Sequence, residues 1–142
     1  MRATANLYYE WDGENGRELL VLEAKEFSGI ASGCPFGELP HLPSGTLGVV
    51  LWNGRLLPVV DLSGQLGTHY AEMLEKARST DRLAYLIAMD PTGQGEVAFA
   101  LPGGVRTFCD DESDGRYVQV HTLSVQEILS RSRGHDVGSK AA

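Results

Sequence analysis

The chain has 142 residues, of which 42% are hydrophobic and 22% charged, with 17 glycines and 6 prolines. This length suits one domain rather than two of full size, and the balance of apolar and charged residues excludes general disorder. A net charge of −7 disfavours a nucleic-acid partner, because the phosphate backbone is itself negative. The glycine content favours short strands and many turns over a helical bundle.

Cysteine content and hydropathy indicate the compartment. Cys34 and Cys109 are too few for a disulfide framework, and we expect both thiols to be free. Asn6, Glu10 and Asp12 interrupt the apolar stretch that a signal peptide requires. No stretch approaches the roughly 18 consecutive apolar residues of a membrane span. The sequence therefore predicts a cytoplasmic protein that does not insert into a membrane.

The first predicted elements are two strands joined by a tight turn. Residues 7–11 are rich in aromatic side chains and residues 19–22 are aliphatic, both of which are typical of strands. Between them, residues 12–16 contain Asp-Gly and Asn-Gly pairs, which favour the positive φ angles of a hairpin turn. Residues 23–27 are predicted to form one short helical turn.

The next region combines a loop with the clearest hairpin of the chain. Residues 29–44 are dense in glycine and proline, so we expect a loop with one short strand around Ile30. Residues 48–52 and 55–60 are apolar runs separated only by Asn53-Gly54. That pair is favoured in two-residue type I′ turns, and it predicts a hairpin.

Four features predict how the chain leaves this hairpin. Pro58 cannot donate a ladder hydrogen bond, so we expect it at a sheet edge or a bulge. Asp61 is predicted to accept hydrogen bonds from backbone N–H groups at the start of a short helix, which Gly67 then ends. Residues 69–78 carry apolar side chains at helical spacing and are either a helix or a mobile loop.

The second half predicts further strands and one more helix. Residues 83–89, 97–101 and 117–120 are predicted strands, and residues 125–129 a short helix. Residues 110–115 form an acidic turn. In total about eight to ten short strands are expected, at the spacing that is typical of small barrels.

Candidate catalytic and metal-binding residues form no recognisable site. A Cys34–His41 or Cys109–His121 pair is conceivable as nucleophile and base, but loop and packing roles are favoured for both cysteines. Residues 110–115 resemble the start of an EF-hand loop, yet His121 stands where the bidentate glutamate is required. The sequence predicts no enzyme, no metal and no cofactor, with a small enzyme or metal protein as an alternative.

One block of about 25 residues is more specific. It contains Leu42-Pro43, a hairpin that begins at Gly48 and reads Pro-Val-Val-Asp-Leu from Pro58, and Leu66-Gly67. In order and spacing this block resembles the CheW family of chemotaxis coupling proteins. In that family a Leu-Pro precedes a Gly-Val strand, a turn ends in Gly, and Pro-Val-Val-Asp-Leu leads into a short helix ending in Leu-Gly.

The resemblance implies a mainly β fold of two packed five-stranded SH3-like barrels with short helices. It extends more loosely over residues 6–129 as a single domain, followed by a flexible tail over residues 130–142. It also implies a non-catalytic adaptor without cofactors. Such a protein binds the regulatory domain of a CheA-type histidine kinase and the cytoplasmic tips of chemoreceptors, which recruit it to arrays at the membrane.

Two positions depart from the family pattern. The family turn usually reads Asn-Leu-Arg-Gly, whereas this chain has Leu51-Trp52-Asn53-Gly54, with Arg55 as the first basic residue. Pro102 stands near a position where the family often has Asp. These departures leave open a divergent module of the same fold that has a different protein partner.

The hairpin supplies the candidate contact residues, because apolar and aromatic side chains beside a tight turn are suited to anchor an interface. The candidates are Leu51, Trp52, Asn53, Gly54, Arg55 and Val59. For Trp52 and Val59 the alternative is a place in the barrel core, since strand alternation turns only one of Leu51 and Trp52 inward. Structural roles are assigned to Pro58, Asp61, Leu62 and Gly67.

Overall fold

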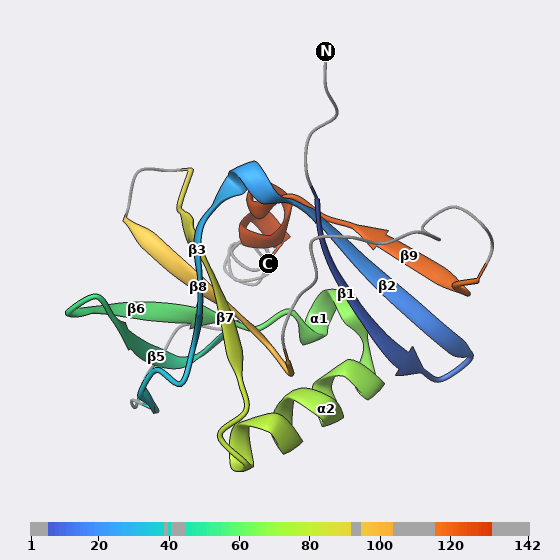
Figure 1. Ribbon diagram of the computed structural model, residues 1–142, viewed down its shortest axis with the longest axis horizontal. Coiled ribbons are helices and arrows are strands. Elements are labelled where there is room, and N and C mark those ends of the chain that lie inside the picture. Colours follow the sequence, from blue (N-terminus) through green and yellow to red (C-terminus); the bar gives the residue numbers. More distant parts are fainter. Residues whose placement is uncertain (1–5, 39, 41–44, 92–94, 104–115, 132–142) are drawn as a thin grey trace, which may run out of the picture.

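Strands dominate the architecture and form two sheets that lie on opposite sides of the molecule (Figure 1). The computed structural model describes residues 6–38, 40, 45–91, 95–103 and 116–131. Within them the fold is mainly β with short helices, as the sequence predicts. The helical segments are the 3₁₀ turn η1 (Ala24–Glu26), α1 (Ser63–Leu66), α2 (Thr68–Ser79) and a helix over residues 125–131.

The first sheet joins both ends of the described chain. Its order is β1 (Asn6–Gly13), β2 (Gly16–Glu23) and β9 (Gln119–Thr122). β1 and β2 form an antiparallel hairpin that closes at the Gly13–Gly16 pair, and β9 lies parallel to β2. Gly16 has a φ of +135°, which explains the glycine at the end of this turn.

The second sheet has six strands. Its order is β3 (Phe27–Ser32), β7 (Ala84–Met89), β8 (Glu96–Leu101), β6 (Arg55–Val60), β5 (Thr46–Trp52) and β4 (Phe36–Gly37). The two end strands, β3 and β4, are separated by only three residues of the chain. The sheet therefore curls, because its two end strands are joined by this short connection. The backbone N–H of Leu51 donates to the carbonyl of Pro35 at 3.0 Å, which extends the pairing of β4 with β5 toward β3.

Most predicted elements are confirmed, with two differences. β4 lies in the segment predicted as a loop, because Phe36 and Gly37 find a pairing partner in β5. β9 begins two residues later than predicted, where it pairs with β2. Of the two alternatives for residues 69–78, the helix is the one that forms. The acidic turn at residues 110–115 lies outside the described residues.

A single apolar cluster connects the two sheets. Trp11 of β1, Tyr70 of α2 and Phe99 of β8 are almost fully buried in it. Trp11 meets Tyr70 edge to face, with ring centroids 5.3 Å apart, and the Tyr70 hydroxyl donates to the Ala100 carbonyl at 3.1 Å. Because Tyr70 contacts both sheets, α2 contributes to the core that they share.

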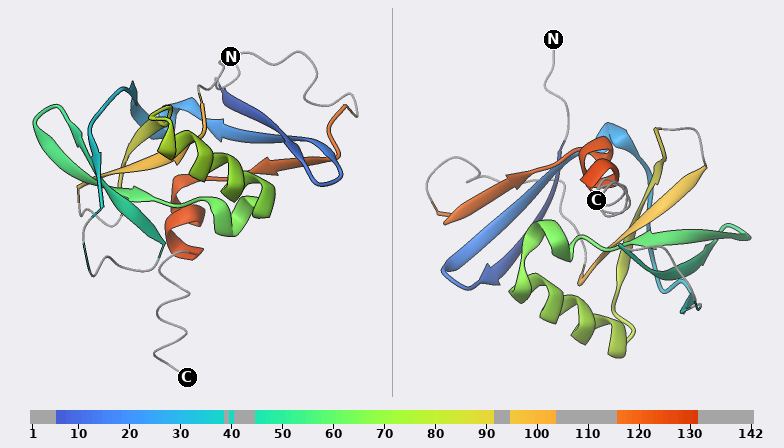
Figure 2. Two further views of the ribbon diagram at one scale, coloured as in Figure 1. Left: turned by 90° about the horizontal axis from the view of Figure 1, so that it is seen from below. Right: turned by 180° about the vertical axis from the view of Figure 1, so that it is seen from behind.

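The C-terminal helix lies between the two sheets (Figure 2), and its start is closely capped. The Ser124 hydroxyl accepts from the Glu127 N–H at 3.1 Å, and the Glu127 carboxylate accepts from the Ser124 N–H at 3.0 Å. This reciprocal pair is a capping box. Glu26 of η1 accepts from the Val125 N–H at 2.9 Å. The helix over residues 125–131 also covers the first two residues of the predicted tail.

Gly48 tests the close packing of the curled sheet. A Cβ at Gly48 would lie 2.3 Å from the Gly37 carbonyl oxygen, whereas a Cβ at Gly37 would have no atom within 4 Å. We expect Gly48→Ala to lower the free energy of unfolding by about 1–3 kcal/mol, because backbone must move. Urea unfolding measures this, with Gly37→Ala as the matched control. Equal stability of the two variants would contradict the packing described.

The buried tyrosines predict loss of stability at alkaline pH. Burial raises the pKa of Tyr9 to about 12, and burial with the nearby Cys34 and Asp81 raises the pKa of Tyr85 to about 12. The folded state thus holds these protons more tightly than the unfolded chain. Their contribution is fully present below a pH of about 10 and is lost between about 10 and about 12. The Tm should fall over that range, and less steeply in Tyr85→Phe; a constant Tm would refute this.

Candidate protein-interaction site

The β5–β6 hairpin forms as its sequence predicts. Trp52 and Arg55 are the closing pair, so the turn consists of Asn53 and Gly54 alone. Their φ angles are +51° and +75°, the two positive values that a type I′ turn needs. This turn fixes the register, in which Leu51 stands opposite Leu56.

The two faces of the hairpin differ sharply in exposure. On the inner face, Val50 and Leu57 are buried opposite each other. On the outer face, Leu51 and Leu56 are 41% and 64% exposed. The next outer pair is the half-buried Val49 and the exposed Pro58. We call Val49, Leu51, Leu56 and Pro58 the outer hairpin patch.

Trp52 and Val59 belong to the inner face. The side chain of Trp52 is half-buried and packs on the main core, and a Cβ on Gly29 of β3 would lie 3.0 Å from Trp52 Cζ2. Val59 is fully buried, so it has no surface to offer a partner. The structure therefore places Val59 in the core rather than among contact residues, and it places Trp52 against the opposite end of the curled sheet.

Arg55 is exposed but already engaged. Its guanidinium forms an ion pair with Glu96 at the start of β8. The Ser28 hydroxyl donates to the same carboxylate at 3.1 Å. Arg55, Glu96 and Ser28 thus join β6, β8 and β3 at the turn end of the sheet. Asn53 and Gly54 are exposed beside them.

The residues after the patch hold the hairpin in place. Pro58 is not at a sheet edge, because β6 lies between β5 and β8. Counted from the closing pair, Val49–Pro58 is a non-hydrogen-bonded pair, and pairing with β8 starts only at Val59. The missing N–H of Pro58 therefore leaves no gap in either ladder, which is why a proline fits in this interior strand.

The helix start at Asp61 is confirmed. Asp61 Oδ1 accepts from the Ser63 N–H at 2.8 Å, and the Asp61 N–H donates to the Gly45 carbonyl at 2.8 Å. Leu62 is fully buried, and Gly67, with a φ of +98°, ends α1 and precedes α2. Asp61, Leu62 and Gly67 thus lie at the turn and short helix that the sequence predicts.

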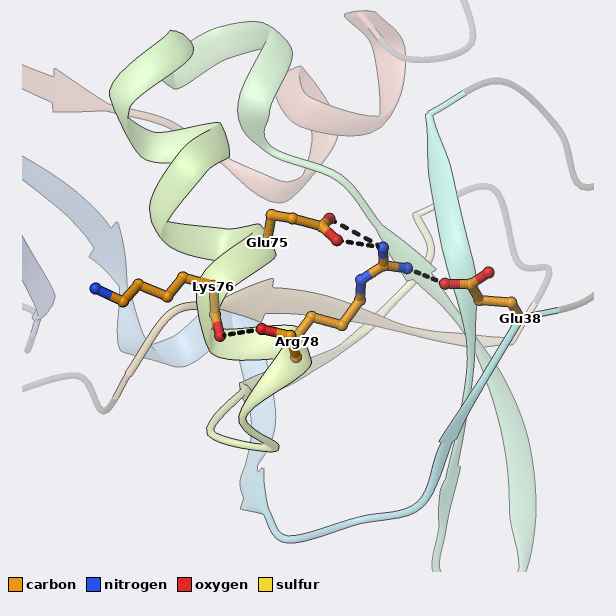
Figure 3. A network of polar contacts seen from close by, with 5 residues as sticks. Glu38, Glu75, Lys76 and Arg78 are labelled. Atoms are coloured by element: carbon orange, nitrogen blue, oxygen red, sulfur yellow. Dashed lines mark hydrogen bonds and ion pairs between the residues drawn. The ribbon is translucent and has the colours of Figure 1, made fainter.

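Arg78 attaches α2 to the strand segment beside the hairpin (Figure 3). Its guanidinium bonds Glu75 on the same helix at 2.7 Å and also pairs with Glu38, which follows β4. In the sequence, Glu38 precedes the β5–β6 hairpin and Arg78 follows it. Their ion pair therefore connects α2 to the segment after β4, on either side of the hairpin in the chain.

The alternative sites find no support in the described residues. Cys34 is a free, half-buried thiol, whereas Cys109, His41 and the acidic turn lie outside the described part. His121 Nε2 lies 2.8 Å from Glu18 Oε1 and its ring stacks on Trp11. Within the described ranges, no group of three His, Cys, Asp or Glu side chains is placed to hold a metal ion. No helix in these ranges has the length and apolar character to cross a membrane.

Sequence reasoning missed Leu56, the most exposed large apolar side chain of the described residues. The signal was present, because a two-residue turn fixes the pairing of the strands that it joins. Once Asn53-Gly54 is the turn, Leu56 must stand opposite Leu51 and share its face. Strand alternation then makes Leu51 and Leu56 a pair of outward side chains.

Asp61 provides a test of the structural assignment. We expect Asp61→Ala to lower the free energy of unfolding by about 1 kcal/mol, because the Ser63 N–H loses its acceptor. Asp61→Asn keeps a hydrogen-bond acceptor, so its free energy of unfolding should be close to that of the unchanged protein. Thermal or urea unfolding distinguishes them. If both variants lost the same stability, charge rather than the hydrogen bond would be responsible.

Comparison with known proteins gives similarity to solved structures only. No protein-family model matches the sequence, and no curated protein matches it. Among solved structures, the crystal structure of the scaffolding protein TtCheW from Thermoanaerobacter tengcongensis is similar, with 14% sequence identity and a TM-score of 0.48. The match covers 78% of this chain and 69% of that one.

Proposed function

We propose that the protein is a non-catalytic adaptor of a chemosensory array, which binds the regulatory domain of a CheA-type histidine kinase and couples it to chemoreceptor tips. The observation that carries this proposal is the block from Leu42 to Gly67. Its sequence resembles the CheW family, and its described residues form a continuous hairpin, Asp61 turn and short helix. That unit presents an apolar surface to solvent.

The proposed fold is the pair of barrels that the resemblance implies. β3 and β4 count as one bent strand in this interpretation, because only residues 33–35 separate them and they pair with β7 and β5 respectively. The second sheet then becomes a closed barrel of five strands. The first sheet contributes three strands of the other barrel within the described residues.

The outer hairpin patch is the proposed contact surface. Leu51 and Leu56 are exposed neighbours on a rigid two-stranded ribbon, so their burial by a partner costs little conformational freedom. A stable interface needs roughly 800 Å² from each partner, so the patch serves as the anchor of a larger surface that includes Asn53 and Gly54 at its rim. Val59 is excluded because it is buried.

A second candidate function is favoured by Arg55. The family's basic turn residue is replaced by Asn53, and the Arg55 guanidinium is held by Glu96. A partner that relies on a free cation at the turn would find none here among the described residues. A divergent module of the same fold with a different protein partner is therefore the alternative, and it retains the apolar anchor.

Titration calorimetry tests both candidates. The protein is titrated with the regulatory domain of each CheA-type kinase encoded beside it, and we expect a micromolar Kd, about −8 kcal/mol. Leu56→Lys should weaken binding about 10-fold or more, because it places a charge where the patch is buried. Val118→Lys is the matched control, because this valine beside the other sheet is 56% exposed, against 64% for Leu56.

Three outcomes are distinguished. Binding that is lost in Leu56→Lys and kept in Val118→Lys supports the patch. Binding that neither variant changes would place the kinase contact elsewhere on the protein. Absence of saturable binding to every kinase domain would remove the coupling role and favour the divergent module.

A further inference from the structure

A groove of about 350 Å³ lies at the C-terminal end of α2. No residue of the β5–β6 hairpin lines it, so it is separate from the outer hairpin patch. The lining combines apolar and basic side chains. The residues are Met73, Lys76, Ala77, Thr80, Arg82 and Pro102.

The composition of the groove suits a ligand with both apolar and charged groups. Met73, Ala77 and Pro102 offer apolar surface, while Lys76 and Arg82 are exposed. Both line the groove and are exposed, and long basic side chains in such places bury their aliphatic stems while the charged ends stay in water. The volume is in the range of a small binding pocket and accommodates a few side chains.

Within the described ranges, Lys76 and Arg82 lack the ion pair that most other basic residues have. Arg17, Lys25, Arg55 and Arg78 each have a carboxylate oxygen within 4 Å. For Lys76 and Arg82 no such ion pair occurs within the described part of the chain. Figure 3 shows the Lys76 side chain pointing away from Arg78 and its carboxylate partners. Lys76 and Arg82 therefore have charge to offer a ligand.

We propose that this groove binds an acidic amphipathic segment of a protein partner. An aliphatic side chain of the segment lies on Met73, Ala77 and Pro102, and carboxylates of Asp or Glu residues around it pair with Lys76 and Arg82. The net charge of −7 repels acidic ligands in general, so the attraction of an acidic segment to this groove rests on the local charges of Lys76 and Arg82.

This surface is additional to the proposed kinase contact. It uses α2 and the residue after β8, and its occupant is recognised by charge as well as by apolar contact. Pro102 is also one of the two positions at which the chain departs from the CheW pattern. The groove thus gives a physical role to a residue that the resemblance leaves unexplained.

Peptide selection tests the proposal. A random twelve-residue phage-displayed library is selected on the full-length protein and, separately, on the K76E/R82E double variant. The control is K25E/R131E, which makes the same change in net charge at two exposed cations away from the groove. We expect the unchanged protein and the control to enrich peptides that combine Leu, Ile or Met with two or more Asp or Glu. K76E/R82E should not enrich them.

Binding of the enriched peptide, measured by fluorescence anisotropy, provides the second readout. We expect a loss of about 10-fold or more in K76E/R82E, a loss with Gln in place of the peptide's acids, and weaker binding at high salt. Thr80→Trp, which fills the groove, should also weaken it. Peptides without acidic residues, or equal binding to K76E/R82E and the control, would overturn the proposal.

The same variants separate this inference from the proposed function. K76E/R82E should leave kinase binding unchanged, and Leu56→Lys should leave peptide binding unchanged. If the protein binds no kinase domain but selects acidic peptides through Lys76 and Arg82, the peptide-binding proposal is supported and the coupling role is refuted. If it binds a kinase domain but selects no acidic peptides, the peptide-binding proposal is refuted and the coupling role is supported.

Discussion

The surface of this protein depends on the two-residue turn at Asn53 and Gly54. Two positive φ angles in succession are accessible to this pair at low cost, and they fix which residues of β5 and β6 stand opposite each other. A slip of β6 by one residue against β5 would turn Leu57 to the outside and Leu56 to the inside. The buried core and the exposed apolar pair are therefore set by the same local geometry.

The inner face of the hairpin shows why local sequence predicted only part of the site. Alternation correctly predicted that one of Leu51 and Trp52 faces inward, but it did not decide which one. That choice depends on Gly29, whose lack of a side chain leaves room for the Trp52 ring. Gly29 lies in a segment where glycine and proline left only one short strand, around Ile30, to be predicted, and its proximity to Trp52 exists only in the curled sheet.

Elements that depend on distant partners were the hardest to predict. β4 has only two residues, too few for a periodic pattern, and it exists because β5 pairs with it. β9 is displaced by two residues because its limits are set by parallel pairing with β2. By contrast, the Asp61 turn and the end of α1 at Gly67 are local, and the sequence predicted both. The capping box of Ser124 and Glu127 is equally local. The Ser-x-x-Glu spacing would have predicted this helix start, but sequence reasoning missed this signal.

The pairing of β2 with β9 has a consequence for synthesis of the chain. Glu18 stands opposite Gln119, and Glu26 caps the N-terminus of the last helix, so the first hairpin receives its neighbours from residues about 100 positions later. Contacts over such separations form late, because the intervening chain must first be ordered. On the ribosome, the β5–β6 hairpin can form before residues 119–122 are synthesised, while the edge of β2 that pairs with β9 is still unpaired. A nascent chain at that stage exposes the edge of β2 to incorrect strand pairing, until residues 119–122 cover this edge as β9.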